Sequence, residues 1–270
     1  MPTLKKDGSQ QVPDQFEGST VIIITVQDYP SPGDTTRLSF MPDEEATQAE
    51  MDAFGNGAIS VQNVNTTPPD IPVCFVKGTL ITTPSGQIPV EDLRAGDLVK
   101  TRGQGDQPVR WVGSQKFLAH GKYAPIRIRA GALGNTRDLL VSPQHRMLLT
   151  GWRLELLFDH TEVLVTAKSL LNDQSITRED GGEVEYYHIL LDNHQIIFAE
   201  GCPSESFHPG GQAMTSFSKA TQQEIYELFP ALKGDIGNYG KTARISLKSH
   251  ETAIALRALQ QQPAYRPIDR

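Results

Sequence analysis

Short apolar runs separated by turn-forming residues dominate the middle of the chain, from residue 74 to about residue 207. They begin with GTLITT and continue through LVKT, PVRWVG, IRIRA, DLLVS, RMLLT, EVLVTA, EYYHILL and QIIFAEG. Runs of this length, punctuated by Gly, Pro, Asp and Ser, are typical of strands that follow one another closely. The pattern therefore predicts an all-β domain with one short helical turn at residues 167–172, in which Trp111 and Trp152 are packing residues.

The segment before residue 74 has a different composition. Residues 1–18 are polar and rich in turn formers, and we expect them to be disordered. Between residues 19 and 65, STVIIITVQDY, TTRLSFM and GAISVQNVN predict strands, and DEEATQAEMDAF predicts a helix. TPPDIP at 67–72 predicts an extended hinge, because each proline biases the preceding residue away from the helical region.

A helical pattern replaces the strand pattern after SFHPGG. SKATQQEIYELFPAL has Ile225, Leu228 and Phe229 at helical spacing, and Pro230 is predicted to end that helix. SHETAIALRALQQQ predicts a second helix, for which Ser249 is a candidate N-cap. The predicted parts are an N-terminal segment (1–73), a mainly β domain (74–207) and a helical C-terminal extension (208–270).

The composition narrows the class of protein. A net charge of −7 over 270 residues, with no dense cluster of Lys or Arg, argues against a nucleic-acid surface. No apolar run is long enough to span a bilayer, and the first residues lack the layout of a signal peptide. We therefore expect no nucleic-acid partner and no transmembrane segment, and a location in the cytoplasm or outside the cell by a non-classical route.

Cys74 stands at the boundary between the polar N-terminal segment and the first predicted strand of the β domain. The only other cysteine is Cys202, which excludes a disulfide framework. A thiol that follows an accessible peptide bond can attack the preceding carbonyl, here that of Val73, and form a thioester. The site would have to distort an amide with a rotation barrier of about 18–20 kcal/mol. A positioned histidine contributes about 10²–10⁴-fold to such chemistry, and an oxyanion donor about 10²–10³-fold.

Two later segments supply hydroxyl, imidazole and carboxyl groups. In VSPQHRML, Ser142 and His145 are three residues apart after a predicted strand, so one tight turn can present both to a single point. In YYHILLDNHQIIFAEG, His188, Asp192 and His194 have even spacing and would share one face of a regular strand. These side chains and the cysteine form the candidate catalytic set.

CFVKGTLITTPSGQIPVEDLRAGDLVKT, VSPQHRML and YYHILLDNHQIIFAEG, taken in order, resemble a bacterial Hint domain, the Hedgehog/intein self-processing fold. The resemblance covers about residues 74–207 and implies a horseshoe-like all-β fold with pseudo-two-fold symmetry. It also implies an N-to-S acyl shift in which Cys74 attacks the carbonyl of Val73. By the same resemblance, His145 protonates the leaving amide nitrogen and Ser142 orients the junction. His194 would then assist resolution of the thioester, and no cofactor is expected.

Three departures from the family pattern bear on the reaction. Ser142 stands where Thr is usual, and His188 stands where an acidic residue is common, which leaves Asp192 as a candidate substitute. Splicing domains end in His-Asn followed by Cys, Ser or Thr, whereas the corresponding GCPSESFHPG has no Asn. We therefore expect single-turnover autocatalytic release of residues 1–73 without splicing. The chain's own N-terminal segment would be the substrate, and the acyl acceptor would be water or an external amine, thiol or lipid-like nucleophile.

Other interpretations of the same residues stay open. Cys74, His145, His188 and His194 are ligand types that suit zinc, although no short pair of the C-x-x-C kind is present. A cysteine–histidine hydrolase that acts on other proteins is a second alternative. A third is a catalytically degenerate Hint fold that serves as a binding or structural module, in which the cysteine is a small buried side chain.

Overall fold

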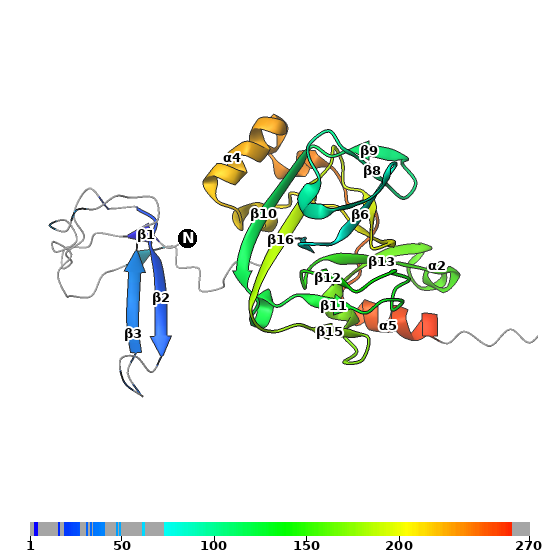
Figure 1. Ribbon diagram of the computed structural model, residues 1–270, viewed down its shortest axis with the longest axis horizontal. Coiled ribbons are helices and arrows are strands. Elements are labelled where there is room, and N and C mark those ends of the chain that lie inside the picture. Colours follow the sequence, from blue (N-terminus) through cyan, green and yellow to red (C-terminus); the bar gives the residue numbers. More distant parts are fainter. Residues whose placement is uncertain are drawn as a thin grey trace, which may run out of the picture. The chain divides into compact units, whose positions relative to one another are not determined.

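The computed structural model describes residues 73–260 continuously, together with residues 3–4, 16, 19–27, 31, 33, 35–40, 47, 49 and 61–62 (Figure 1). The chain divides into two compact units, Met1–Pro68 and Pro69–Arg270, and each is described by itself. The predicted acidic helix and most of the segment predicted to be disordered lie outside the described residues.

The described part of the first unit consists of two short antiparallel pairs of strands. β2 (Ile22–Gln27) and β3 (Thr35–Phe40) form a hairpin where the apolar pattern predicts strands. β1 (Thr3–Leu4) pairs with β4 (Val61–Gln62). Thr3 and Leu4 therefore form a short strand within a segment predicted to be disordered, because a distant stretch of chain supplies backbone partners that composition does not reveal.

Two six-stranded antiparallel sheets form the second unit, which makes it mainly β, as the sequence predicts. The first sheet has the strand order β10-β16-β5-β12-β11-β15, the second has the order β14-β13-β18-β17-β6-β7, and β8 pairs with β9. The strands are β5 (Phe75–Val76), β6 (Leu80–Thr83), β7 (Gly86–Pro89), β8 (Leu98–Lys100), β9 (Asp106–Pro108), β10 (Trp111–Leu118), β11 (Ile126–Ile128), β12 (Leu139–Val141), β13 (Arg146–Thr150), β14 (Glu162–Thr166), β15 (Ile176–Arg178), β16 (Glu183–Leu190), β17 (Ile196–Ala199) and β18 (Cys202–Glu205).

Strand β5 lies inside the first sheet, between β16 and β12. Phe75 is paired with Val141 of β12 on one side and with Tyr187 of β16 on the other. β12 leads directly into the turn that carries Ser142, and His188 is the next residue along β16. This register therefore brings two distant segments to the residue that precedes β5.

Apolar side chains from both sheets form the main core of the second unit. Phe75, Ile81, Ile126, Leu139 and Met147 are fully buried in it, and each comes from a different strand. Burial of a side chain of this size stabilises a fold by about 1.5–3 kcal/mol relative to exposure. The packed core thus gives the short strands a rigid frame.

Helices lie between and after the strands. The α-helices are α2 (Trp152–Phe158), α3 (Gly211–Thr215), α4 (Lys219–Leu228) and α5 (Ser249–Gln260). The 3₁₀ helices are η2 (Val90–Asp92), η3 (Gly121–Tyr123), η4 (Ala167–Leu170), η5 (Pro230–Lys233) and η6 (Ile236–Tyr239). α4, α5 and η4 occur where the sequence predicts helical structure, whereas α2 does not follow from the pattern.

One predicted helix boundary is confirmed and one is wrong. α4 ends at Leu228, just before Pro230, as predicted, and Pro230 then opens the separate 3₁₀ helix η5, because proline suits the first turn of a helix. Ser249 is the first residue of α5 rather than its cap. The carboxylate of Glu251 instead accepts the backbone N–H of Lys248 at 2.7 Å, as in a capping box.

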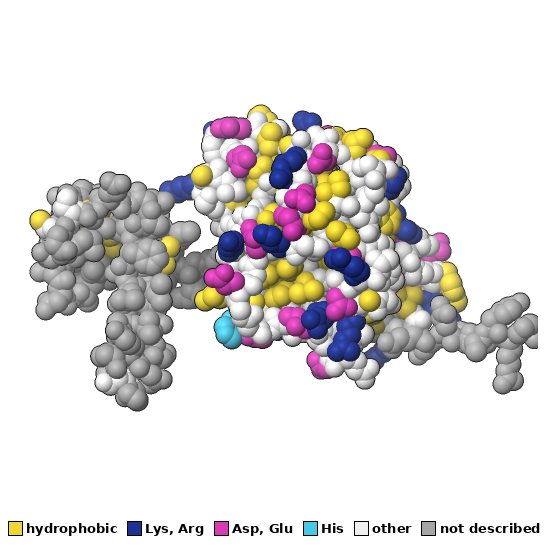
Figure 2. Space-filling view, in the orientation of Figure 1, with side chains coloured by type: hydrophobic (Ala, Val, Ile, Leu, Met, Phe, Trp, Pro, Cys, Tyr) yellow, Lys and Arg dark blue, Asp and Glu magenta, His cyan; other side chains and the backbone are white. Residues whose placement is uncertain are grey.

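The two tryptophans differ in their surroundings. Trp111 is buried, as predicted, but Trp152 is 61% exposed at the start of α2, so the prediction that it packs is wrong. Figure 2 shows charged side chains scattered among apolar ones on one face of the second unit. Among the described residues, no helix has the length and apolar character that crossing a membrane would require.

Candidate active site

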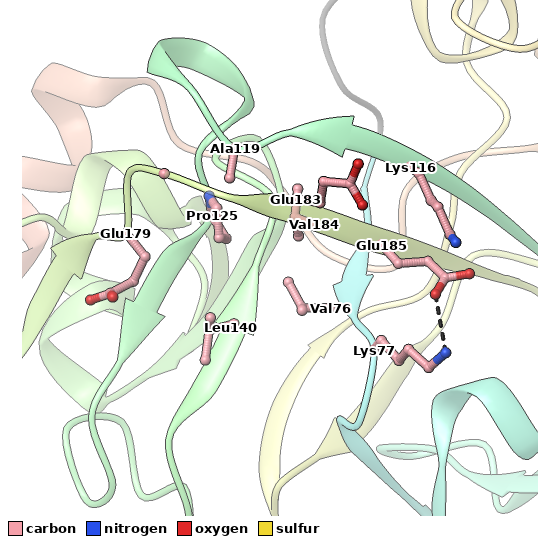
Figure 3. Close-up of a pocket in the computed structure, with 11 residues that line it drawn as sticks. Val76, Lys77, Lys116, Ala119, Pro125, Leu140, Glu179, Glu183, Val184 and Glu185 are labelled. Atoms are coloured by element: carbon pink, nitrogen blue, oxygen red, sulfur yellow. Dashed lines mark hydrogen bonds and ion pairs between the residues drawn. The ribbon is translucent and has the colours of Figure 1, made fainter.

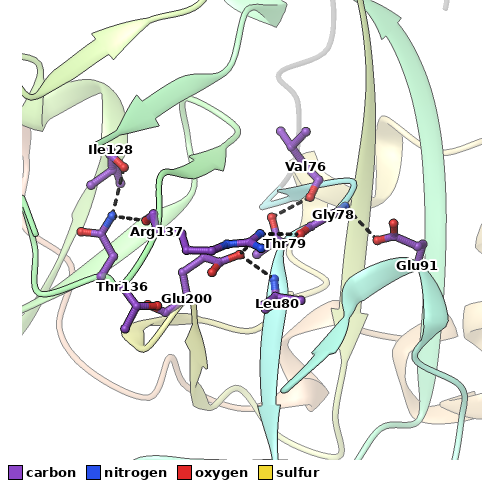
Figure 4. A network of polar contacts seen from close by, with 10 residues as sticks. Val76, Gly78, Thr79, Leu80, Glu91, Ile128, Thr136, Arg137 and Glu200 are labelled. Carbon is purple, nitrogen blue, oxygen red and sulfur yellow. Dashed lines mark hydrogen bonds and ion pairs between the residues drawn. The ribbon is translucent and has the colours of Figure 1, made fainter. Parts of the chain in front are cut away.

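A polar network holds the turn that follows β5 (Figure 4). The Thr79 hydroxyl donates to the carbonyl oxygen of Val76 at 2.6 Å. The buried carboxylate of Glu200 accepts from the Leu80 N–H at 2.8 Å and from the Arg137 guanidinium at 3.1 Å. These bonds tie β5 and β6 to distant parts of the chain and so fix the position of the residues that precede β5.

The backbone of Cys74 is held by the turn after β12. Its N–H donates to Ser142 Oγ at 3.2 Å, and the Ser142 N–H donates to the Cys74 carbonyl at 3.0 Å. His145 Nδ1 lies 3.0 Å from the same carbonyl oxygen. Because a carbonyl oxygen only accepts, this contact requires a proton on Nδ1 of His145. One tight turn thus presents both side chains to the cysteine, as their spacing predicts.

His188 on β16 contacts both the thiol and the carbonyl that precedes it. Its Nδ1 lies 2.9 Å from the carbonyl oxygen of Val73. The Cys74 sulfur lies 3.5 Å from Nδ1 and 3.7 Å from Nε2 of the same ring. The contact with the carbonyl places a proton on Nδ1, so in the neutral ring Nε2 is an acceptor within reach of the thiol.

The groups around the cysteine are shielded from water. Cys74, Ser142, His145 and His188 have no exposed surface, and Val73 is 9% exposed. Burial raises the pKa of the Cys74 thiol well above its usual value, and the Ser142 hydrogen bond offsets this only in part. Burial also lowers the pKa of His145 and of His188 to about 4. At pH 7 the resting site therefore holds a neutral thiol and two neutral imidazoles.

Aromatic rings surround His188 on its other sides. Phe217 meets it edge-to-face with ring centroids 4.9 Å apart, and Phe207 does so at 5.4 Å. Trp111 stacks on it at 6.4 Å. These rings bury the apolar surface of the imidazole, while its nitrogens contact the Val73 carbonyl and the Cys74 thiol.

His194 belongs to a second buried polar cluster. Its Nδ1 accepts the Ala243 N–H at 2.8 Å, which leaves the ring proton on Nε2. That nitrogen lies 3.0 Å from a carboxylate oxygen of Glu205, outside the angle of a hydrogen bond. The other oxygen of Glu205 accepts the Arg146 N–H at 2.9 Å. The negative charge of Glu205 also opposes the effect of burial on the pKa of His145, which couples the two clusters.

The even spacing of His188, Asp192 and His194 does not place them on one strand face. β16 ends at Leu190 and β17 begins only at Ile196, so of the three only His188 lies on a strand. Asp192 is half exposed, and its carboxylate pairs with Arg110 at 3.2 Å. The prediction of a shared face is therefore wrong, because a turn interrupts the strand that the spacing assumes, and Asp192 is not among the groups that contact Cys74.

The second cysteine lies elsewhere. Cys202 is buried in the main core, and its thiol contacts the carbonyl oxygen of Leu133 at 3.5 Å. Burial raises its pKa to about 12. Within the described region, no three His, Cys, Asp or Glu side chains are placed to hold a metal ion, so the residues weighed as zinc ligands do not form a ligand cluster there.

A pocket of about 390 Å³ opens where β16 begins (Figure 3). Ala119 and Val184 line it and pack in the same apolar cluster as Cys74. Lys77 and Glu185 form a 3.2 Å ion pair at its edge. Because the cysteine has no exposed surface, the thiol is closed off from this pocket.

Several residues of the site carry no signal in the sequence. Phe207 lies in GCPSESFHPG just after the family blocks, and Phe217 lies beyond them. The sequence pattern predicts that Trp111 is a packing residue, but it does not predict that Trp111 lies next to His188. Strand alternation identifies buried positions, but it does not say which distant ring a buried side chain meets.

Comparisons with known proteins identify a family for this chain. A family model described as Hint domain matches residues 73–211. No curated protein matches the chain. The chain is similar to a bacterial intein-like domain from Clostridium thermocellum, with 15% identity, coverage of 50% of this chain and 97% of that one, and a TM-score of 0.37. It is also similar to a DnaB intein from Synechocystis sp. PCC 6803, with 13% identity, coverage of 50% and 98%, and a TM-score of 0.34.

A Hint domain acts on its own flanking segments, and this fold supports self-processing in general. The family model extends over more than half of the chain and begins at the residue before the buried cysteine. The protein belongs to the Hint domain family.

Proposed function

We propose that this protein cleaves itself between Val73 and Cys74 by an N-to-S acyl shift. The main observation in support of this proposal is that the two reacting groups, the Val73 carbonyl and the Cys74 thiol, contact the same imidazole. The carbonyl oxygen of Val73 and the thiol of Cys74 lie 2.9 Å and 3.5 Å from Nδ1 of His188. We propose that residues 1–73 are the cargo and residues 74–207 the processing domain.

The first step uses both nitrogens of His188. Nε2 takes the thiol proton, and the sulfur attacks the carbonyl carbon of Val73, whose C=O electrons move to oxygen. Nδ1–H donates to that oxygen throughout, and its donation strengthens as negative charge develops there. Imidazolium formation is unfavourable in a buried site, but the adjacent oxyanion compensates for part of that cost.

The second step breaks the Val73–Cys74 amide. The oxyanion returns its electrons, the C–N bond breaks, and the amide nitrogen takes up a proton as it becomes the amine of Cys74. Ser142 is hydrogen-bonded to this nitrogen, and the His145 Nδ1–H is held on the carbonyl of the same residue. In the proposal the Ser142 hydroxyl orients the nitrogen and His145 supplies its Nδ1 proton. Nε2 of His145 takes up in exchange the proton that His188 gained from the thiol, so both imidazoles end the step neutral and the thiol proton is accounted for on the new amine.

The thioester is then resolved by water or by an external nucleophile. GCPSESFHPG has no Asn that could cyclise, so splicing is not part of the proposal. We assign His194 to this later stage, because it is buried beside Glu205 rather than in contact with the thiol. The released product is the fragment 1–73, as an acid or joined to the acceptor.

Intact mass of the full chain over time, with and without dithiothreitol, tests this proposal. We expect a break between Val73 and Cys74 that dithiothreitol accelerates and that Cys74→Ala abolishes. Cys202→Ala is the matched control, because it removes the other buried thiol and leaves cleavage unchanged. His188→Gln is expected to slow cleavage about 10²-fold or more, because it removes the base.

A chain that stays whole with thiol at every pH from 5 to 9 would overturn the proposal. That result would favour the alternative in which the Hint fold serves as a binding or structural module. Equal cleavage in wild type and Cys74→Ala would instead assign the break to another protease.

A further inference from the structure

The helical extension packs against the residue that precedes the cysteine. A second apolar cluster, separate from the main core, is formed by Val73, Trp111, Leu190, Phe207, Met214, Phe217, Ile225, Leu232 and Tyr239. None of these is more than 9% exposed, and the last five belong to the extension. α4 lies beside β10, as Figure 1 shows, and the two line a common groove. The extension thus covers Val73 with apolar side chains.

Phe217 reaches the candidate catalytic imidazole directly. It lies in the connection between α3 and α4, immediately before Ser218, whose hydroxyl caps α4. Its ring meets His188 edge-to-face at 4.9 Å and also contacts Phe207 at 5.5 Å and Trp111 at 5.9 Å. The side chain is therefore fixed by the helix on one side and by two aromatic rings on the other.

We propose that residues 211–239 complete the processing site, with Phe217 as a positioning residue for His188 and the extension as a cover that keeps water from the thioester. This inference rests on the proposed acyl shift. It adds a part of the chain that lies beyond the Hint family match, which ends at residue 211.

Positioning matters because His188 has to serve two atoms at once. The ring has to keep Nδ1 on the Val73 oxygen while Nε2 faces the thiol, and rotation about the side-chain torsions breaks one contact or the other. An aromatic edge packed on the ring restricts that rotation. Misplacement of a reacting group by about 1 Å costs about 10²-fold in rate.

Exclusion of water decides the fate of the thioester. Water is by far the most concentrated nucleophile in the cell, so an exposed thioester is lost to hydrolysis. Under the extension Val73 is 9% exposed and Cys74 is fully buried. A closed, poorly hydrated site also strengthens the hydrogen bonds to the developing oxyanion. The cover therefore favours formation of the thioester and delays its hydrolysis.

The test compares Phe217→Ala with Leu154→Ala in the full chain. Leu154 is fully buried on α2 and belongs to the main core, so its truncation weakens the fold without touching the second cluster. Free cysteine at fixed concentration is the probe, because it captures a thioester as a stable amide whose mass differs from that of the hydrolysed acid. Phe217→Ala is expected to slow total cleavage about 10–10²-fold and to raise the ratio of hydrolysed to captured product. Leu154→Ala is expected to keep the wild-type ratio.

A second readout does not depend on cleavage. In a Cys74→Ala background, NMR titration of the His188 ring is expected to show its pKa rising from about 4 towards 6.5 when Phe217→Ala admits water. Leu154→Ala in the same background leaves that pKa unchanged. If Phe217→Ala does not fold, Phe217→Leu replaces it. That variant retains most of the apolar cover but lacks the ring, so it is expected to slow cleavage with the wild-type product ratio.

The outcomes separate this inference from the function on which it rests. If the wild type never forms the amide with free cysteine, the proposed acyl shift itself is overturned. If the wild type cleaves but Phe217→Ala matches Leu154→Ala in rate, product ratio and His188 pKa, only the proposed role of the extension is overturned.

Discussion

At the scale of single residues, the site is defined by one imidazole shared between a thiol and a carbonyl. His188 stands where the family commonly has an acid, yet it contacts the Val73 oxygen and the Cys74 sulfur at 2.9 and 3.5 Å. A carboxylate could take the thiol proton but could not donate to the carbonyl oxygen unless protonated. The imidazole has a donor and an acceptor at once, so the departure at this position is compatible with catalysis.

The buried imidazoles make the stability of the fold depend on pH. Burial lowers the pKa of His145 and His188 to about 4, whereas in the unfolded chain their pKa is near 6.5. Between these values the unfolded state binds more protons, so the free energy of unfolding rises with pH across this window. Stability is fully present above pH 6.5 and is lost as the pH falls towards 4, by about 3 kcal/mol for each ring considered alone.

Urea unfolding at pH 7, 5.5 and 4.5 checks this prediction. His188→Gln is expected to flatten the pH dependence relative to wild type, because the amide has no proton to gain in this range. His160→Gln is the control, because His160 is exposed and its replacement leaves the slope unchanged. Parallel stability curves for wild type and His188→Gln would contradict the prediction.

At the scale of elements, β10 and β16 shape the pocket around His188. They pair over eight residues, from Trp111 opposite Leu190 to Leu118 opposite Glu183. Gly113 follows Trp111 by two positions on β10, and the indole lies over it. The absence of a side chain at this glycine lets Trp111 lie against the strand and reach the histidine.

Gly113→Ala tests this arrangement. An added Cβ would lie 2.1 Å from two ring atoms of Trp111, so the indole has to move. We expect a destabilisation of about 1–3 kcal/mol, as for other overpacked sites, and slower cleavage. In a Trp152→Phe background Trp111 is the only tryptophan, and its fluorescence is expected to shift to the red as it meets water.

Gly234→Ala provides the matched comparison. A Cβ at this exposed glycine meets no heavy atom within 4 Å, so both stability and fluorescence stay close to wild type. If Gly113→Ala leaves the emission wavelength of Trp111 unchanged, the proposed role of Gly113 in placing the indole is wrong.

At the scale of the whole molecule, the proposed cleavage point lies next to a boundary between two compact units. The first ends at Pro68, and the second contains every strand from β5 onward. Val73 is the last residue of the proposed cargo, yet its side chain is packed with the extension of the second unit. Cleavage would therefore remove one apolar side chain from the second cluster and none from the main core.

The remaining protein, residues 74–270, is thus expected to stay folded after cleavage. Its thermal unfolding should keep the cooperativity of the intact chain, with a modest fall in Tm from the loss of Val73. Circular dichroism of the purified product, measured beside intact Cys74→Ala protein, checks this expectation. A product that unfolds without a cooperative transition would show that the first unit is needed for the stability of the second.

Much of this protein follows from local sequence. Apolar runs between turn residues predict the strands, and the Ser142–His145 spacing predicts a turn that faces one point. The position of Cys74 between a polar segment and the first predicted strand of the β domain predicts its candidate chemistry. Each of these features depends on neighbours within a few residues, where steric and hydrogen-bonding preferences act directly.

The tertiary structure alone decided which distant groups meet the cysteine. Strand order and register place His188 beside Val73, and the extension places Phe217 against the ring of His188. A turn that the residue spacing does not predict leaves the Asp192 carboxylate half exposed and paired with Arg110. Such contacts depend on how whole strands and helices pack, and packing selects among many pairings that local patterns allow equally. The sequence therefore determined the elements and the candidate nucleophile, and the packing of those elements determined the surroundings of that cysteine.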